Sequence, residues 1–308
     1  MEMIQMQIQI LVFLIIGWIF GRKGWISRTS AGQLNFLVMN LILPCSIFHA
    51  FCTPLTEEIL QSASSILVLA CLLQVGFWIV SKLIWKRIPD KSEQINLEYG
   101  TVCNNAGTLG MVIGQAAFGS EGVLYTSIYA IPLRMVLWGY GLPLYTKSDT
   151  LKGKQLAKKV LTNPCMIAIV AGILMMAASS AGFILPSVVD SIITSLAQCN
   201  TPMIMIVIGV ILSDLPLKDL TGKEPALYCL IRLVFLPALC LVILQVLGIG
   251  GMPLKICVLE TAMPAPVTMA MLSQRYRQNE SFASRLVFLS TVLSMITLPL
   301  WTLALNMI

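Results

Sequence analysis

Residues 261–268 read Thr-Ala-Met-Pro-Ala-Pro-Val-Thr, within an apolar stretch, 254–273, that has the length of a transmembrane helix. Pro264 and Pro266 lack a backbone N–H, and each pushes the residue before it out of the α-helical region. A continuous helix through this segment is therefore not expected. Because an unpaired backbone group in lipid costs several kcal/mol, the broken segment must face protein or a polar cavity.

A second interrupted stretch lies at 103–114, near the centre of the apolar segment 95–117, and reads Cys-Asn-Asn-Ala-Gly-Thr-Leu-Gly-Met-Val-Ile-Gly. Asn is a poor helix former, and each Gly costs about 1 kcal/mol relative to Ala. Half-helices that begin at such breaks offer N–H groups and positive dipole ends to an anion. Two kinked packing helices without a ligand are the alternative, but breaks at matching places in two halves of a chain favour a binding site.

Apolar segments of this kind recur along the whole chain, which is 57% hydrophobic and only 11% charged. Each has about the 20 residues that a helix needs to cross a bilayer. The ten segments are 2–20, 33–51, 62–84, 95–117, 122–146, 161–180, 187–211, 225–248, 254–273 and 282–305, numbered here as spans 1 to 10. We therefore predict an all-α polytopic membrane protein with ten transmembrane helices.

The basic residues sit almost entirely on one side of this pattern, since 17 of the 20 Lys and Arg lie in or beside alternate loops. They are Arg22, Lys23, Arg28, Lys82, Lys86, Arg87, Lys91, Lys147, Lys152, Lys154, Lys158, Lys159, Lys218, Lys223, Arg275, Arg277 and Arg285. The positive-inside rule then places these loops in the cytoplasm and both termini outside. We expect a multi-pass protein of the cell membrane. The net charge of +6 is topogenic, so it does not indicate a nucleic-acid partner.

The two halves of the chain show weak self-similarity. Leu-Pro-Leu-Tyr-Thr at 142–146 matches Leu-Pro-Leu-Trp-Thr at 298–302, an offset of 156 residues. We divide the chain into a first five-helix repeat (1–146), a Lys-rich cytoplasmic linker (147–160) and a second repeat (161–308). Because five is odd, the second copy must be inserted upside down, which gives the inverted 5+5 repeat typical of secondary transporters.

Four of the charged residues inside the spans bear on function or on topology. Arg134, in the middle of span 5, should face protein or water, and its partner is either an organic carboxylate or carbonyls freed by Pro132 or by a broken helix. Glu260, close to the span-9 break, is a candidate for carrying a coupling proton or for shaping the site. Glu98 is a second coupling candidate, or a residue of the cytoplasmic interface. Arg232, seven residues into span 8, is expected to extend to the cytoplasmic surface.

Other classes of protein fit poorly. The chain has no HExxH, GxSxG or Gly-x-Gly-Asp motif and a single histidine, His49, so we do not expect an enzyme. Its nine cysteines include no CxxC pair, and we expect no metal site and no cofactor. A membrane sensor or receptor is a further alternative, but such proteins usually carry a soluble signalling domain.

Several short motifs resemble the auxin efflux carrier family. They are Asn105 with Gly110 and Gln-Ala-Ala-Phe-Gly at 115–119, Leu-Thr-Asn-Pro at 161–164, Ile-Gly-Val-Ile-Leu at 208–212, and Ala-Met-Pro-Ala-Pro at 262–266 followed by Arg275-Tyr276. The resemblance covers all ten spans, and the short 147–160 loop is similar to the bacterial, malate-permease-like members. One departure is that the family often has a proline at the span-4 break, where this chain has Asn104, Gly107 and Gly114.

The resemblance implies that spans 4 and 9 cross at their breaks, and that spans 1, 2, 6 and 7 form a scaffold for a transport bundle of the other six. It also implies that Asn105 contacts substrate, that Pro264 and Pro266 form the opposing break, and that the scaffold helices form a homodimer. The related bile acid/sodium symporter group shares this plan, so a sodium-coupled symporter is the alternative within transport.

We therefore predict a secondary active transporter, or permease, of small organic anions such as mono- or dicarboxylates, coupled to H⁺ or Na⁺. The predicted substrate-binding residues are Asn104, Asn105, Gly107, Arg134, Pro264, Ala265 and Pro266. The coupling candidates are Glu260 and Glu98.

Overall fold

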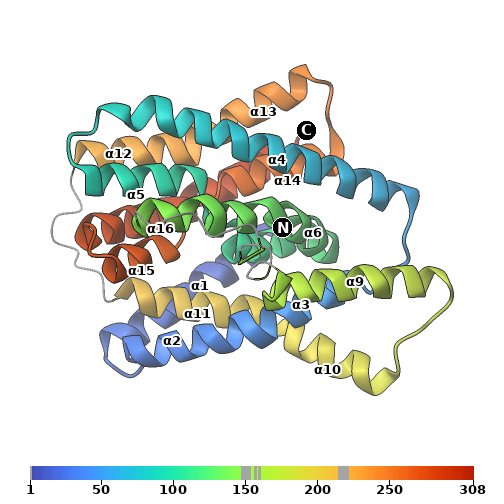
Figure 1. Ribbon diagram of the computed structural model, residues 1–308. Helices are drawn as coiled ribbons and strands as arrows, with labels where there is room; N and C mark the ends of the chain where they lie inside the picture. Colours follow the sequence, from blue (N-terminus) through green and yellow to red (C-terminus); the bar gives the residue numbers. More distant parts are fainter. Residues whose placement is uncertain (1, 147–153, 156–157, 159–160, 214–221) are drawn as a thin grey trace. The chain divides into compact units, whose positions relative to one another are not determined.

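The computed structural model describes residues 2–146, 154–155, 158, 161–213 and 222–308, and every regular element within them is a helix (Figure 1). Five helices are long and apolar enough to cross a membrane, and two shorter apolar helices, Ile8–Arg22 and Pro164–Ser180, accompany them. The five long ones are Thr29–Ala50, Glu57–Arg87, Ser187–Ser213, Lys223–Val246 and Glu280–Asn306, which correspond to spans 2, 3, 7, 8 and 10.

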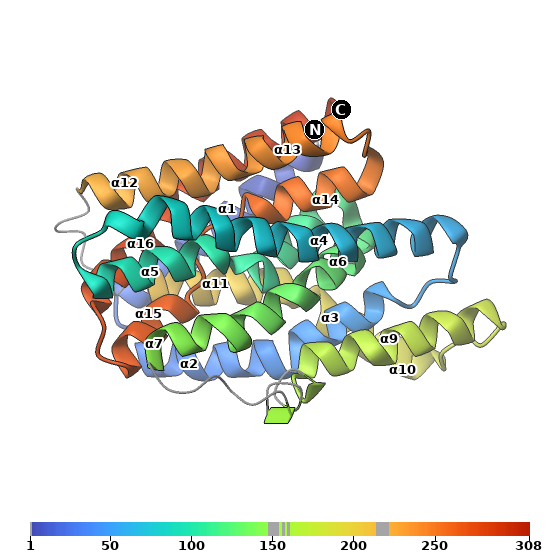
Figure 2. The same cartoon turned by 45° about the horizontal axis from the view of Figure 1, so that its top comes forward.

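The first of two compact units comprises residues 1–62, 111–128 and 161–215. Its helices are α1 (Glu2–Arg22), α2 (Arg28–Leu37), η1 (Val38–Ile42), α3 (Leu43–Ala50), α9 (Pro164–Ser180), α10 (Ser187–Gln198) and α11 (Asn200–Ser213), with the middle of α6 (Leu109–Val136). Helix α1 packs along α11 (Figure 1), and α3 packs against α9 and α10 (Figures 1 and 2).

The second unit comprises residues 63–110, 129–160 and 216–308. It contains most of α4 (Glu57–Ile84), η2 (Trp85–Arg87), α5 (Lys91–Val102), η3 (Asn105–Gly107), both ends of α6, η4 (Leu137–Gly141), α7 (Leu142–Thr146), α12 (Lys223–Leu230), η5 (Ile231–Phe235), α13 (Leu236–Val246), α14 (Gly251–Thr261), α15 (Thr268–Arg275) and α16 (Glu280–Asn306). Both predicted helix breaks belong to this unit.

The units do not follow the two halves of the sequence. Spans 1, 2, 6 and 7 fall in the first unit, which is the grouping that the resemblance implied for the scaffold. Segment 111–128, where spans 4 and 5 join, also belongs to the first unit. Gly119 turns the chain there with φ 62°, a conformation that favours glycine. The predicted linker, 147–160, lies almost wholly outside the described residues.

Proline shapes the helices of spans 2, 5 and 8 in the same way. Pro44, Pro143 and Pro237 each follow a leucine that comes directly after a five-residue π-helix: η1, η4 and η5. A proline inside a helix removes one N–H and clashes with the carbonyl four residues earlier, and the wider π turn relieves that clash. Neighbouring side chains bind carbonyls that such turns leave free, as when Trp301 Nε1 donates to Leu233 O at 2.9 Å.

Close packing in the first unit depends on glycine. A Cβ placed on Gly17 of α1 would collide with the backbone of Ile206, and one on Gly209 of α11 would collide with the backbone of Leu14. The Gly17-x-x-x-Gly21 pattern therefore marks a close contact between helices, as its spacing suggests.

We predict that Gly17→Ala destabilises the protein by about 1–3 kcal/mol, because the added methyl group overpacks α1 against the backbone of α11. The measurement is the thermal unfolding midpoint of the detergent-solubilised protein. Gly32→Ala is the matched control, since nothing lies within 4 Å of a Cβ at that exposed position. Equal midpoints for the two variants would contradict the close contact.

Candidate functional site

Span 4 is broken at the place predicted from its Asn and Gly residues. Helix α5 ends at Val102, Cys103 is extended, and a single 3₁₀ turn, Asn105–Gly107, precedes the start of α6 at Leu109. No side chain caps the N-terminus of α6. Its first N–H groups therefore point into the break without a side-chain acceptor from the capping position.

Span 9 is broken at Pro-Ala-Pro. Helix α14 ends at Thr261, α15 begins at Thr268, and the residues between them, 262–267, form no helix. The N-terminus of α15 also lacks a side-chain cap. Both breaks are buried, so their backbone groups require partners within the protein.

The two breaks provide partners for each other. The Asn105 N–H donates to Pro264 O at 3.0 Å, and Asn104 Nδ2 donates to Glu260 O at 2.6 Å. The Asn104 Oδ1 atom also accepts from the Ala106 N–H at 3.2 Å, which fixes the side chain. The predicted approach of the backbone near 104–110 to the backbone near 263–266 is therefore confirmed. The Asn104 side chain therefore has a structural role, since its hydrogen bonds hold the crossing together.

Arg232 completes this arrangement, and the expectation that it extends to the cytoplasmic surface is wrong. Its side chain is 0% exposed, and it donates from Nε to Met263 O and from Nη1 to Thr101 O, each at 2.9 Å. One turn earlier, the Tyr228 hydroxyl donates to Gly100 O at 2.8 Å. Helix α12 and η5 thus supply side chains that bind carbonyls at the C-terminal end of α5 and within the span-9 break.

Arg134 lies beside the span-4 break. Its side chain is only 8% exposed, and a Cβ built on Gly107 would be 4.0 Å from its Nη2 atom. Neither Nη1 nor Nη2 donates a hydrogen bond to any part of the chain that the structure describes. The carbonyl oxygens of Thr101 and Met263, at the two breaks, bond Arg232 and not Arg134. A buried guanidinium without acceptors is costly unless an anion completes it.

Glu260 is fully buried where α14 ends. Its Oε2 atom packs so closely on Gly110 that a Cβ at that position would overlap it. Because Gly110 is the second residue of α6, the carboxyl group lies against the N-terminal turn of a half-helix, where the helix dipole favours negative charge.

Glu98 has a different environment. Lys82 Nζ approaches its Oε2 at 2.6 Å and Gln94 Nε2 donates to its Oε1 at 2.9 Å. Lys82 lies in the last turn of α4 with its side chain 45% exposed, so this ion pair is at the end of that helix. These contacts fit the interface interpretation of Glu98 better than a place at the crossing.

Sequence reasoning missed the polar contacts that join the half-helix α5 to the half-helix α15 and to α7. The Asn96 Oδ1 atom accepts from the hydroxyls of Tyr145 at 2.8 Å and Ser273 at 2.5 Å. Near the breaks, the hydroxyls of Tyr99 and Thr268 are 2.9 Å apart. No local pattern predicts these pairs, because their members are 49 to 177 residues apart in the chain.

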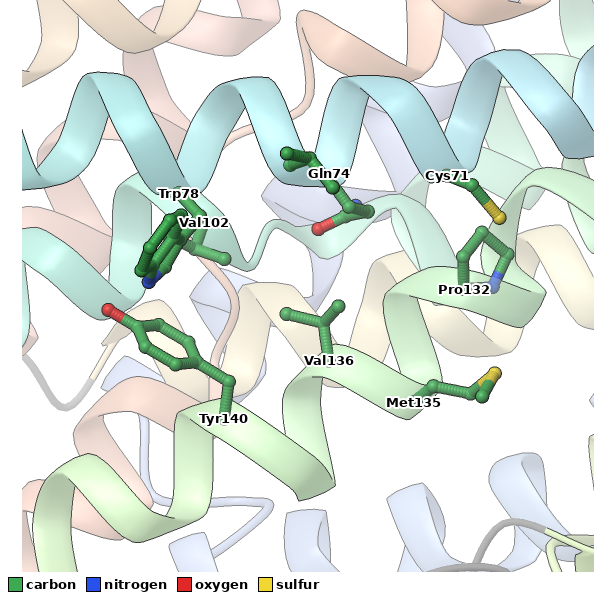
Figure 3. Close-up of a pocket in the computed structure, with 9 residues that line it drawn as sticks. Cys71, Gln74, Trp78, Val102, Pro132, Met135, Val136 and Tyr140 are labelled. Carbon is green, nitrogen blue, oxygen red and sulfur yellow. The ribbon is translucent and has the colours of Figure 1, made fainter.

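A separate cavity of about 330 Å³ opens beside the break, and Figure 3 shows Gln74 and Trp78 extending from α4 toward Val136 and Tyr140. None of the nine residues that line it is charged: Cys71, Gln74, Val75, Trp78, Val102, Pro132, Met135, Val136 and Tyr140. It offers no cation to a carboxylate, so the crossing next to Arg134 remains the better candidate for an anion site.

Comparison with known proteins agrees with the helical, membrane-spanning character of the chain. Residues 3–302 match the family described as membrane transport protein. An uncharacterized transporter of Methanothermobacter thermautotrophicus is 25% identical over 302 residues, covering 97% of each chain. An uncharacterized transporter of Methanocaldococcus jannaschii is 22% identical over 301 residues, covering 95% of each.

The family match spans nearly the whole chain, including both helix breaks and the arginines beside them. The resemblance noted from the short motifs is confirmed, and an enzyme is not indicated. The chain belongs to the membrane transport protein family, which is the auxin efflux carrier family, and it is a membrane transporter.

Proposed function

We propose that this transporter is a permease that moves small organic anions, mono- or dicarboxylates, by alternating access at the crossing of the two broken helices. The observation that carries the proposal is Arg134, a buried guanidinium beside the span-4 break whose terminal nitrogens have no acceptor among the described residues. A carboxylate matches the guanidinium geometry with two parallel hydrogen bonds.

The surroundings support an anion. The uncapped N-terminus of α6 begins two residues beyond Gly107, and that of α15 begins two residues beyond Pro266. Half-helix N-termini and a fixed cation are the groups by which broken-helix transporters hold anionic substrates. The remaining contacts that we propose for the substrate are Asn105, Gly107, Pro264, Ala265 and Pro266. Asn104 keeps its structural role at the crossing when substrate binds.

Two coincidences of numbering support an inverted 5+5 repeat of ten helices, with halves 1–146 and 161–308. Asn104 and Glu260, which are hydrogen-bonded, are 156 residues apart, the offset that relates 142–146 to 298–302. Repeat-equivalent residues that touch each other lie on the pseudo-twofold axis. The same offset relates Arg134, beside the span-4 break, to Ser290, whose Oγ accepts from the Ala265 N–H in the span-9 break at 3.1 Å.

Alternating access then consists of movement of the transport bundle, spans 3–5 and 8–10, against the scaffold. The protein lies in the cell membrane with both termini outside, and the scaffold helices form a homodimer. The coupling ion is H⁺, carried by Glu260, because its carboxyl group touches the N-terminal turn of a half-helix that borders the substrate site. A carboxyl group whose surroundings differ between two conformations exchanges a proton with the conformational change.

For Arg134→Lys and Arg134→Gln we predict at least tenfold weaker binding of the carboxylate, because the two parallel hydrogen bonds from the guanidinium are lost. Substrates are first identified by proteoliposome uptake of labelled acetate, lactate, malate and succinate, and binding to the purified variants is then titrated. For Arg134→Gln the thermal unfolding midpoint should hold or rise, since this substitution removes a buried charge without protein acceptors. If the variants bind the carboxylate with unchanged affinity, whether or not they lose stability, Arg134 has only a structural role.

Topology is tested by labelling single cysteines placed in a cysteine-free background. An impermeant maleimide added to intact cells should modify Thr56→Cys and Gly250→Cys and spare Lys86→Cys, because the positive-inside rule places residue 86 in the cytoplasm. All three positions are exposed, so accessibility within the protein is matched. Labelling of Lys86→Cys in intact cells would overturn the orientation.

Glu260→Gln should abolish accumulation of carboxylate driven by a pH gradient while exchange of substrate at equal concentrations continues, because only the proton-carrying group is lost. Glu58→Gln, at an exposed position, is the matched control and should behave as the unaltered protein. If Glu260→Gln still concentrates substrate on a pH gradient alone, Glu260 is not the proton carrier, and Glu98 becomes the next residue to test.

A further inference from the structure

Arg232 joins the two broken helices through backbone oxygens. Thr101 lies in the last turn of α5 and Met263 lies in the span-9 break, and both carbonyls accept from the one guanidinium at 2.9 Å. The guanidinium carbon of Arg232, Cζ, also lies 5.3 Å from the centre of the Phe77 ring. The immediate surroundings of the charge are therefore carbonyl dipoles and an aromatic face, both of which favour a cation.

The Thr101 carbonyl is free for Arg232 because the helix is broken. In a continuous helix it would accept from the N–H of residue 105, four positions on. The Asn105 N–H donates to Pro264 O instead. The Met263 carbonyl lies in a segment that forms no helix and that contains two prolines without N–H groups. Breaking the helices thus exposes carbonyl oxygens whose natural partner is a cation.

Unwound carbonyls and half-helix C-termini are the groups with which broken-helix transporters coordinate a coupling sodium ion. Carbonyl oxygens suit such hard cations. In this chain one of the carbonyl oxygens is at the end of a half-helix and the other is in the break, and a covalently attached cation bonds both.

We propose that Arg232 acts as a built-in cation in place of a coupling sodium ion at the crossing. The proposal rests on the transport function proposed above and deepens it: the carbonyls of Thr101 and Met263 form a monovalent-cation site whose occupant belongs to the chain. The transporter is consequently indifferent to sodium at this point, and loss of the guanidinium opens the site to a free cation.

The test compares thermal unfolding midpoints of detergent-purified protein in chloride salts of choline, potassium, sodium and methylguanidinium at constant ionic strength. The unaltered protein and Arg232→Lys should give the same midpoint in every salt. Arg232→Ala and Arg232→Gln should unfold several degrees lower in choline and recover in sodium or methylguanidinium, with a saturable dependence on concentration.

Tyr228→Phe is the matched control, because it removes a neutral donor to Gly100 O one turn away and leaves the cation in place. It should lose stability and show no cation-dependent recovery. If the unfolding midpoints of Arg232→Ala and Arg232→Gln do not respond to any cation, Arg232 only supports the packing of the crossing and the proposal is wrong. A midpoint of the unaltered protein, or of Arg232→Lys, that rises specifically with sodium would also overturn the proposal.

The readout does not depend on the substrate. A cation response of Arg232→Ala stands even if no carboxylate is transported, and a lack of response leaves the Arg134 site untouched. The two proposals therefore fail separately.

Discussion

The hydrogen bond from the Asn105 N–H to Pro264 O is the contact on which the rest of the site depends. Lipid offers no water to a broken helix, so each break must find its partners within the protein. Two breaks that meet solve this problem together, since the donors of one bind carbonyls of the other. Asn104 and Arg232 add the side-chain bonds that fix the crossing, at Glu260 O, Thr101 O and Met263 O.

The two buried arginines of the second unit differ in how many of their nitrogens are hydrogen-bonded. Arg232 is bonded to two carbonyls across the crossing, whereas the terminal nitrogens of Arg134 have no acceptor in the described part of the chain. The same chemistry therefore indicates two roles. Arg232, bonded through Nε and Nη1 with only Nη2 left without an acceptor, holds the crossing in place, while Arg134, with both terminal nitrogens left without one, is suited to an anion that binds and leaves.

The sequence predicted the helix breaks because their causes are local: two prolines in one span, and Asn and Gly residues in the other. The Gly17-x-x-x-Gly21 spacing is another local pattern, of the kind that permits a close contact between helices. Sequence reasoning failed for Arg232 because depth along a helix does not reveal which face a residue occupies, and its partners are 31 and 131 residues away. The Asn96 contacts were missed for the same reason.

The central claim is that a carboxylate binds Arg134 where the two breaks cross. An experimental density map of the protein with its transported carboxylate tests it most directly. We expect the carboxylate within hydrogen-bonding distance of both terminal nitrogens of Arg134 and next to 105–107 and 264–266. A carboxylate bound elsewhere, with Arg134 bonded to protein carbonyls, would contradict it.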